Sequence, residues 1–263
     1  MTLFAPAGNL TLHYTDTGHR DGPPLVLAHG LGTDLSVWDA VLPHLPSGLR
    51  VIRYDLRGHG RTDVPVPPYS MGALIRDTEG LLDLLGVRDC AFVGLGLGGM
   101  IAQGLAVKRL DLVRALVLAG TAAKWGLPRT WQAQAITAKT EGMHAVADQV
   151  MARWFSPKAI REGHARNAYS RLTKMHPDGY AGGCAAIAGT DFLTPTSGLR
   201  LPVLGIAGAD DRATPPDLVR ETLAAIPGSR FELMRRAGHL MCVDQPQGFA
   251  TLLTAFVQDT GHI

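Results

Sequence analysis

The chain has 263 residues, of which 46% are hydrophobic and 18% charged, and its formal net charge is +2 at pH 7. This composition is typical of a soluble globular protein, and the small charge gives no sign of a nucleic-acid partner. No run of about 18 apolar residues occurs, so we expect no membrane-spanning segment and no membrane partner.

The cysteines argue against a disulfide or metal scaffold. Cys90, Cys184 and Cys242 lie far apart and form no CxxC pair. That arrangement is typical of a reducing compartment and does not predict a structural zinc site. The N-terminal residues also lack the basic and apolar regions of a signal peptide. We therefore expect a cytoplasmic protein with no cofactor and no bound metal.

Short apolar runs alternate with longer segments of helical spacing along the chain. The runs predict strands at Leu25–Ala28, Val51–Tyr54, Ala91–Leu95, Ala115–Leu118, Val203–Ala207 and Phe231–Met234. The longer segments predict helices at Met71–Leu85, Leu97–Val107, Pro216–Ile226 and Pro246–Phe256. This alternation predicts an α/β fold with a mostly parallel central sheet and helices on both faces.

The alternation stops between Thr121 and Pro195, where the pattern is helical throughout. We expect residues 1–120 and 196–263 to form the core, and residues 121–195 to form an inserted helical lid. Such a lid would cover the carboxyl edge of the sheet, where open α/β sheets bind ligands. The insertion has nine Lys and Arg against five Asp and Glu. It is either a solvated helical surface or a lid whose field favours an anionic substrate.

A glycine-rich segment, Gly94–Gly99, follows a predicted strand and opens a predicted helix. It matches the GxGxxG dinucleotide fingerprint, but the next strand ends in Ala119-Gly120-Thr121, without the acidic residue that such a site needs. It also matches the Gly-x-Ser-x-Gly nucleophile elbow with glycine at the central position. Gly96 suits that strained turn because it has no Cβ, but it supplies no nucleophile.

The segment His29–Gly32 follows the first predicted strand. In an elbow-type site this loop provides one oxyanion donor, here the backbone N–H of Leu31. The second donor is the N–H of the residue after the elbow, Leu97.

An acid and a histidine follow in chain order. Asp210 and Asp211 lie on the loop after a predicted strand, where a carboxylate can orient a histidine, although turn chemistry also favours Asp. His239 follows the last predicted strand. Elbow, acid and histidine in this order are typical of one fold. We interpret His59 as structural, and Cys242 as a buried thiol rather than a substitute nucleophile.

Together these segments resemble the α/β-hydrolase superfamily over essentially the whole chain, and more closely the 3-oxoadipate enol-lactonases of aromatic degradation. The resemblance rests on residues Asp55–Gly60, Phe92–Leu95, Gly98–Met100, Thr121–Lys124, Arg153–Phe155 and Gly183–Ile187. The last three segments lie in the predicted lid and are the more specific ones.

The resemblance implies an α/β-hydrolase fold and hydrolysis of a small lactone or carboxylic ester by a Ser–His–Asp mechanism. His239 would act as base and then as acid. Asp211 would orient it, because Asp211–Pro216 matches the D-x-A-T-P-P pattern of the family. The resemblance also implies that substrate groups lie under the lid near Trp131 and Trp154.

Gly96 departs from this pattern, and three accounts follow. In the first account, engineering removed the nucleophile. In the second, the chain is a natural homologue that binds its ligand without turnover. In the third, His239 and Asp211 activate water directly. Loss of the nucleophile costs roughly 10⁶ in turnover in serine hydrolases. We therefore expect a chain that binds a small lactone or ester and hydrolyses it very slowly. The rival is a non-catalytic ligand-binding use of the same fold.

Overall fold

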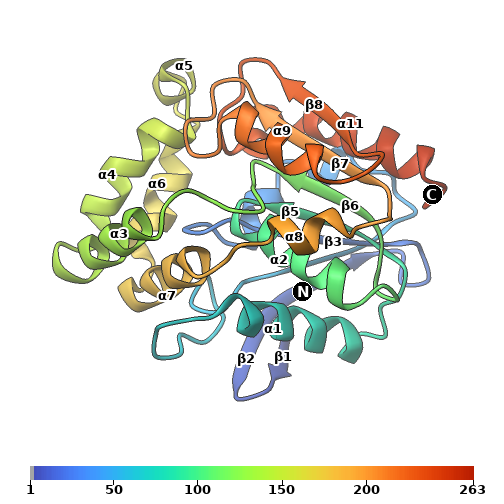
Figure 1. Cartoon of the computed structure of the whole chain (residues 1–263), viewed down its shortest axis with the longest axis horizontal. Coiled ribbons are helices and arrows are strands. Elements are labelled where there is room, and N and C mark those ends of the chain that lie inside the picture. Colours follow the sequence, from blue (N-terminus) through green and yellow to red (C-terminus); the bar gives the residue numbers. More distant parts are fainter. Residues whose placement is uncertain (1–2) are drawn as a thin grey trace.

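The computed structural model describes residues 3–263, which form one sheet of eight strands in the order β1-β2-β4-β3-β5-β6-β7-β8 (Figure 1). The strands are β1 (Leu3–Ala7), β2 (Leu10–Gly18), β3 (Pro24–Ala28), β4 (Arg50–Tyr54), β5 (Cys90–Leu95), β6 (Val113–Ala119), β7 (Val203–Gly208) and β8 (Arg230–Met234). From β4 to β8 along the sheet all neighbours pair in parallel, whereas β2 pairs antiparallel with both β1 and β4. The mostly parallel sheet and the six predicted strands are confirmed.

The antiparallel hairpin β1–β2 was not predicted from the sequence. In β1 only Ala5 and Ala7 are buried, and Pro6 between them is exposed. The second half of β2, from Tyr14 onward, is partly or fully exposed. Antiparallel strands with one solvent-exposed face lack the continuous apolar run that identifies a buried parallel strand.

Helices cover the sheet (Figure 1). Outside the predicted lid they are α1 (Met71–Leu84), α2 (Leu97–Lys108), α9 (Pro216–Ala224), α10 (Met241–Asp244) and α11 (Pro246–Asp259), with short 3₁₀ turns η1 (Leu35–Trp38) and η2 (Leu42–His44). Gly94 and Gly205 point to the same face because both pair with Leu118 in register. A Cβ on Gly94 would collide with α2, and one on Gly205 with Leu223 of α9. These two helices therefore pack closely on the same face of the sheet.

Between β6 and β7 the chain forms helices only. They are α3 (Pro128–Thr140), α4 (Met143–Trp154), α5 (Pro157–Arg161), α6 (Ala165–Lys174), α7 (Pro177–Ala188) and α8 (Leu193–Ser197). Figure 1 shows α3 to α7 gathered at one end of the molecule, beside the sheet. This is the segment predicted as a lid, and its limits at residues 121 and 195 stay a prediction. No helix within residues 3–263 is long and apolar enough to cross a membrane.

The core is continuous between the sheet and its helices. Every residue of β5 and β7 is buried. The helix α2 is buried from Leu97 to Ala106, as expected for a helix enclosed between the sheet and a second helical layer. On η1, Trp38 is fully buried and packs with its ring centroid 5.7 Å from that of Phe249 of α11. This rigid core fixes the strand ends from which the candidate site is built.

Candidate active site

Gly96 lies at the sharp turn between β5 and α2. Its backbone has φ +52° and ψ −114°, a left-handed conformation that side chains rarely adopt. A Cβ on Gly94 or on Gly98 would collide with neighbouring backbone, so both flanking positions require glycine. The hydroxyl of Thr121 donates a 2.6 Å hydrogen bond to the Gly96 carbonyl oxygen and holds the turn in place. The segment has the geometry predicted for a nucleophile elbow.

A side chain at position 96 would point at His239. A Cβ built on Gly96 lies 3.2 Å from His239 Nε2 and 3.4 Å from Cη2 of Trp125. The contact with His239 is tighter than most real Cβ contacts, so the imidazole must move by a few tenths of an ångström to admit a side chain, whereas the indole lies at the limit of ordinary van der Waals contact. Because residue 96 is glycine, the His239 imidazole faces backbone atoms of the turn and no side chain there.

The imidazole of His239 is held by Asp211 on its other side. His239 Nδ1 lies 2.9 Å from Asp211 Oδ2, and both residues are only 3% exposed. Thr214 donates its hydroxyl to the same carboxylate oxygen at 2.6 Å. The other oxygen, Oδ1, accepts the backbone N–H groups of Ala213 and Thr214. Since the carboxylate accepts at Nδ1, Nε2 is left free to take a proton from a group at position 96.

The two adjacent aspartates differ in their surroundings. Asp210 is exposed, and its backbone N–H donates to the carbonyl oxygen of Ala237. Asp211 alone makes the side-chain contact with His239, which agrees with the family pattern used to choose between them.

The predicted oxyanion donors belong to Leu31, on the loop after β3, and to Leu97, the first residue of α2. Neither the N–H of Leu31 nor that of Leu97 has a hydrogen-bond partner within residues 3–263. The loop that carries Leu31 is joined to the elbow, because the N–H of Gly98 donates to the carbonyl oxygen of His29 at 3.1 Å. Two unpaired N–H groups on rigid backbone are what an oxyanion hole requires.

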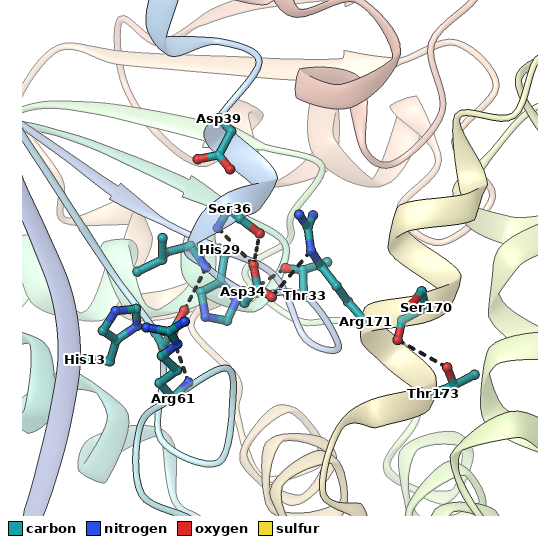
Figure 2. Close-up of polar contacts among 12 residues, drawn as sticks. His13, His29, Thr33, Asp34, Ser36, Asp39, Arg61, Ser170, Arg171 and Thr173 are labelled. Carbon is teal, nitrogen blue, oxygen red and sulfur yellow. Dashed lines mark hydrogen bonds and ion pairs between the residues drawn. The ribbon is translucent and has the colours of Figure 1, made fainter. Parts of the chain in front are cut away.

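The outer end of the same loop contacts the predicted lid. Asp34 accepts a hydrogen bond from the N–H of Ser36 at 2.9 Å, and its other oxygen lies 3.6 Å from Nε of Arg171. Figure 2 shows Arg171 reaching from α6 toward Asp34, beside Thr33 and His29. The loop that carries Leu31 therefore lies between the Gly96 turn and helix α6 of the predicted lid.

A cavity of about 180 Å³ opens onto His239. Its lining is Leu31, Trp125, Gly126, Thr130, Trp131, Gln134, Val150, Arg153, Trp154, Tyr180, Ala213, Leu218 and His239. Trp131 and Trp154, which the resemblance implied, both line it. The rings of Trp154 and His239 stack with centroids 6.1 Å apart. Trp125 was not predicted, and its indole N–H donates to the carbonyl oxygen of Ala213 at 2.9 Å.

The polar part of this lining was also missed from the sequence. The Tyr180 hydroxyl donates to Oε1 of Gln134 at 2.8 Å, and burial raises the pKa of Tyr180 well above its ordinary value. Arg153 is partly buried, and its side chain has no hydrogen-bond or ion-pair partner within residues 3–263. Arg153 lies in a segment that carries the family resemblance, but nothing in the sequence alone places its side chain in a cavity.

Other candidates lie outside this site. Cys242 is fully buried, burial raises the pKa of its thiol, and it does not line the cavity. A larger cavity of about 730 Å³ lies between α5 and the loop after β7. Its wall includes Asp211, but not His239 or Leu31, and much of it is exposed charged side chains. The smaller cavity is therefore the one that contacts the predicted base, His239, and the predicted oxyanion donor Leu31.

Comparisons with known proteins agree with this architecture. Residues 23–246 match the family described as alpha/beta hydrolase fold. The chain is 34% identical over 245 residues to 3-oxoadipate enol-lactonase 2 of Acinetobacter baylyi, covering 92% of this chain and 91% of that protein. The enol-lactonase structure from Burkholderia xenovorans LB400 superposes with a TM-score of 0.94 at 35% identity, covering 97% of this chain and 100% of that one. A malate-bound thermophilic esterase from Thermogutta terrifontis gives a TM-score of 0.91 at 26% identity, covering 99% of each chain. The chain belongs to the α/β-hydrolase fold family.

Proposed function

We propose that the chain binds a small lactone or carboxylic ester and that it hydrolyses this ligand very slowly, because position 96 carries no nucleophile. One observation carries the proposal: the Cβ position of residue 96 lies 3.2 Å from His239 Nε2, while Nδ1 of the same ring lies 2.9 Å from Asp211. Asp211 and His239 therefore have the arrangement of the acid and base of a hydrolase, next to a turn that carries no attacking oxygen.

The chemistry follows from this alignment once serine replaces Gly96. His239 Nε2 takes the hydroxyl proton as the serine oxygen bonds to the lactone carbonyl carbon. The N–H groups of Leu31 and Leu97 stabilise the resulting oxyanion. The carbon–oxygen bond of the lactone then breaks, and His239 returns the proton to the leaving oxygen. Water, activated by the same ring, cleaves the acyl-enzyme and regenerates the serine.

The cavity supports a small ligand. Its volume of about 180 Å³ is below the roughly 300–1,000 Å³ of pockets that hold drug-sized molecules. Its lining residues include three tryptophans and Arg153. A guanidinium without an acidic partner favours an anionic ligand group, so we infer that the lactone or ester carries a carboxylate. The enol-lactonase relatives, by their name, act on a lactone of a dicarboxylic acid, which agrees with this inference.

The test compares three forms of the protein: the chain itself, Gly96→Ser and Gly96→Ala. The alanine variant adds the same Cβ without an oxygen and is therefore the matched control. We expect serine to raise turnover of an enol-lactone and of a short-chain ester by at least about 10³ over the other two forms. A fluorophosphonate probe is expected to label only the serine variant. All three forms should bind a small ketocarboxylate in calorimetry.

The other outcomes overturn the proposal in different ways. Normal turnover by the unmodified chain means that water activated by His239 and Asp211, or another group, performs the reaction. A folded serine variant that binds the ligand but gains no activity means that the protein is a ligand-binding homologue. A chain that binds none of these molecules rejects the substrate class itself.

A further inference from the structure

Two buried histidines lie beneath the predicted oxyanion hole. His29 follows β3 and begins the loop that carries Leu31, and His59 lies in the loop after β4. His29 is fully buried and His59 is 2% exposed. Their ring centroids are 5.2 Å apart, with the planes tilted by 59°. Neither ring lines the cavity, so neither contacts a ligand there.

Each histidine bonds to the loop that carries the other one. Nε2 of His29 accepts the backbone N–H of Leu56 at 2.9 Å. Nε2 of His59 accepts the backbone N–H of Gly32 at 3.2 Å. His29 therefore bonds the loop after β3 to the loop after β4, and His59 bonds the same two loops in the opposite direction.

The partners of these rings also fix their protonation. Nδ1 of His29 lies 2.8 Å from the carbonyl oxygen of Gly30, and Nδ1 of His59 lies 2.9 Å from that of Arg57. A carbonyl oxygen only accepts and a backbone N–H only donates, so each ring carries its proton on Nδ1 and is neutral. Burial lowers the pKa of both rings, that of His59 to about 3.

We propose that His29 and His59 are positioning residues of the oxyanion hole, and that this crossed pair of neutral imidazoles fixes the Leu31 N–H. The inference rests on the proposed function, because it concerns the same site. Gly32 directly follows Leu31, and His59 is the only hydrogen-bond partner of its N–H within residues 3–263.

The surroundings of Gly32 indicate that its hydrogen bond to His59 fixes the position of the loop. Its φ is +78°, and a Cβ there would approach Leu172 and Trp154 of the lid. The loop is thus confined from above by the lid and held from below by His59. An apolar side chain at position 59 would fill the same volume but leave the Gly32 N–H buried without a partner, so the loop must shift to satisfy it. A shift of about 1 Å in a positioned group costs roughly 10²-fold in rate.

The experiment uses Gly96→Ser as the active background and adds His59→Leu or His59→Gln. Gln keeps an acceptor oxygen near the place of Nε2, and Leu does not. We expect His59→Leu to lower kcat about 10- to 100-fold, with KM changed less than about twofold. His59→Gln should recover most of the loss. His19, which is exposed and outside both loops, gives the control His19→Leu, with unchanged kinetics.

Active sites are counted with the fluorophosphonate probe, so that loss of folded protein is separated from a lower kcat per site. An unchanged kcat per site in His59→Leu overturns the proposal. Nitrogen-15 imidazole spectra of the unmodified chain provide a second test, which does not depend on the folding of His59→Leu. Both rings are expected as neutral Nδ1–H tautomers at pH 6, and a proton on Nε2 of either ring overturns the crossed pair. This readout needs no activity, so it remains informative if Gly96→Ser is inactive and the proposed function fails.

Discussion

The backbone N–H of His239 donates a 2.8 Å hydrogen bond to the carbonyl oxygen of Trp154. The next carbonyl upstream, that of Arg153, accepts the N–H of Arg212 at 3.1 Å. The end of α4 is therefore bonded to both the loop that carries the histidine and the loop that carries the acid. A Cβ on Gly238 would collide with the Trp154 carbonyl, which explains the glycine before His239. This segment of the predicted lid therefore contacts both loops of the candidate site, and Arg153 and Trp154 line its cavity.

Trp154→Ala should weaken ligand binding. The substitution leaves the backbone bond to His239 in place but removes the ring that stacks on the imidazole and lines the cavity. Truncation of a buried tryptophan at a binding site costs about 2 kcal/mol or more, so we expect affinity to fall at least about 30-fold. Trp154→Phe, which keeps a flat ring, is the control and should lose much less. Calorimetry on the unmodified Gly96 chain measures both, and equal affinities would show that the ring makes no ligand contact.

Arg153→Met should discriminate between charged and neutral ligands. A hydrogen bond to a charged group contributes about 1.5–3 kcal/mol, so affinity for a carboxylate ligand should fall about 10- to 100-fold. Affinity for a neutral ester of the same size should stay within about threefold. Arg166 of α6 is exposed and outside the cavity, so Arg166→Met controls for the general loss of positive charge. A similar loss for both ligands would assign Arg153 a packing role.

Asp211→Asn in the Gly96→Ser background should nearly abolish turnover. The amide no longer stabilises the imidazolium, and it favours the wrong tautomer of His239. The corresponding change in a serine protease lowers kcat by about 10⁴. Asp210→Asn is the matched control, because Asp210 is adjacent but exposed. Steady-state kinetics on both variants decide the question, and a large effect at Asp210 would reverse the assignment of the acid.

Side chains at position 96 should lower stability. The φ of +52° strains any residue with a Cβ, at a cost of about 1–3 kcal/mol, and the His239 imidazole must also shift. We therefore expect Tm to fall by several degrees in both Gly96→Ser and Gly96→Ala. Gly8 has a φ of +62° and no atom within 4 Å of an added Cβ, so Gly8→Ala isolates the backbone strain. An unchanged Tm in Gly96→Ser would mean that the turn relaxes freely.

The two buried histidines should make the protein sensitive to acid. In the folded state burial lowers the pKa of His59 from 6.5 to about 3, and that of His29 is lowered as well. Between these pH values the unfolded chain binds more protons, so the free energy of unfolding falls as pH drops below about 6.5. The slope reaches at most about 1.4 kcal/mol per pH unit for each histidine.

Urea denaturation across this range measures the effect. In His59→Gln the free energy of unfolding should depend less steeply on pH, because one of the two neutral histidines is absent. Asp34 and Asp55, whose charges oppose the lowering of the histidine pKa values, remain in place in this variant. His19→Gln should keep the full dependence. If the slopes of the unmodified chain and His59→Gln coincide, His59 does not stay neutral in the folded protein.

The sequence by itself determined the parallel part of the fold and the order of the elbow, the acid and the histidine along the chain. Parallel strands buried on both faces are continuous apolar runs, so β3 and β5 to β7 could be located without knowing their partners. The edge strand β8 is mostly exposed and contains Glu232, so its signal in the sequence is weaker. The elbow was recognisable because Gly94 and Gly98 flank the central residue at the spacing of the family pattern. The first turn of α2 restricts Gly94 to glycine locally, whereas the distant Ala28 and His29 carbonyl groups restrict Gly98. The positions of Asp211 and His239 followed from chain order and from the family pattern.

Only the tertiary structure decided what surrounds those residues. The cavity joins Arg153, Gln134 and Tyr180 to His239 from separate helices and loops, and no short-range pattern encodes which side chains face it. The crossed bonds of His29 and His59 join loops 27 residues apart, through atoms whose partners are backbone groups and leave no mark on residue type. Local chemistry therefore fixed which groups are present, and packing between distant segments decided which of them meet.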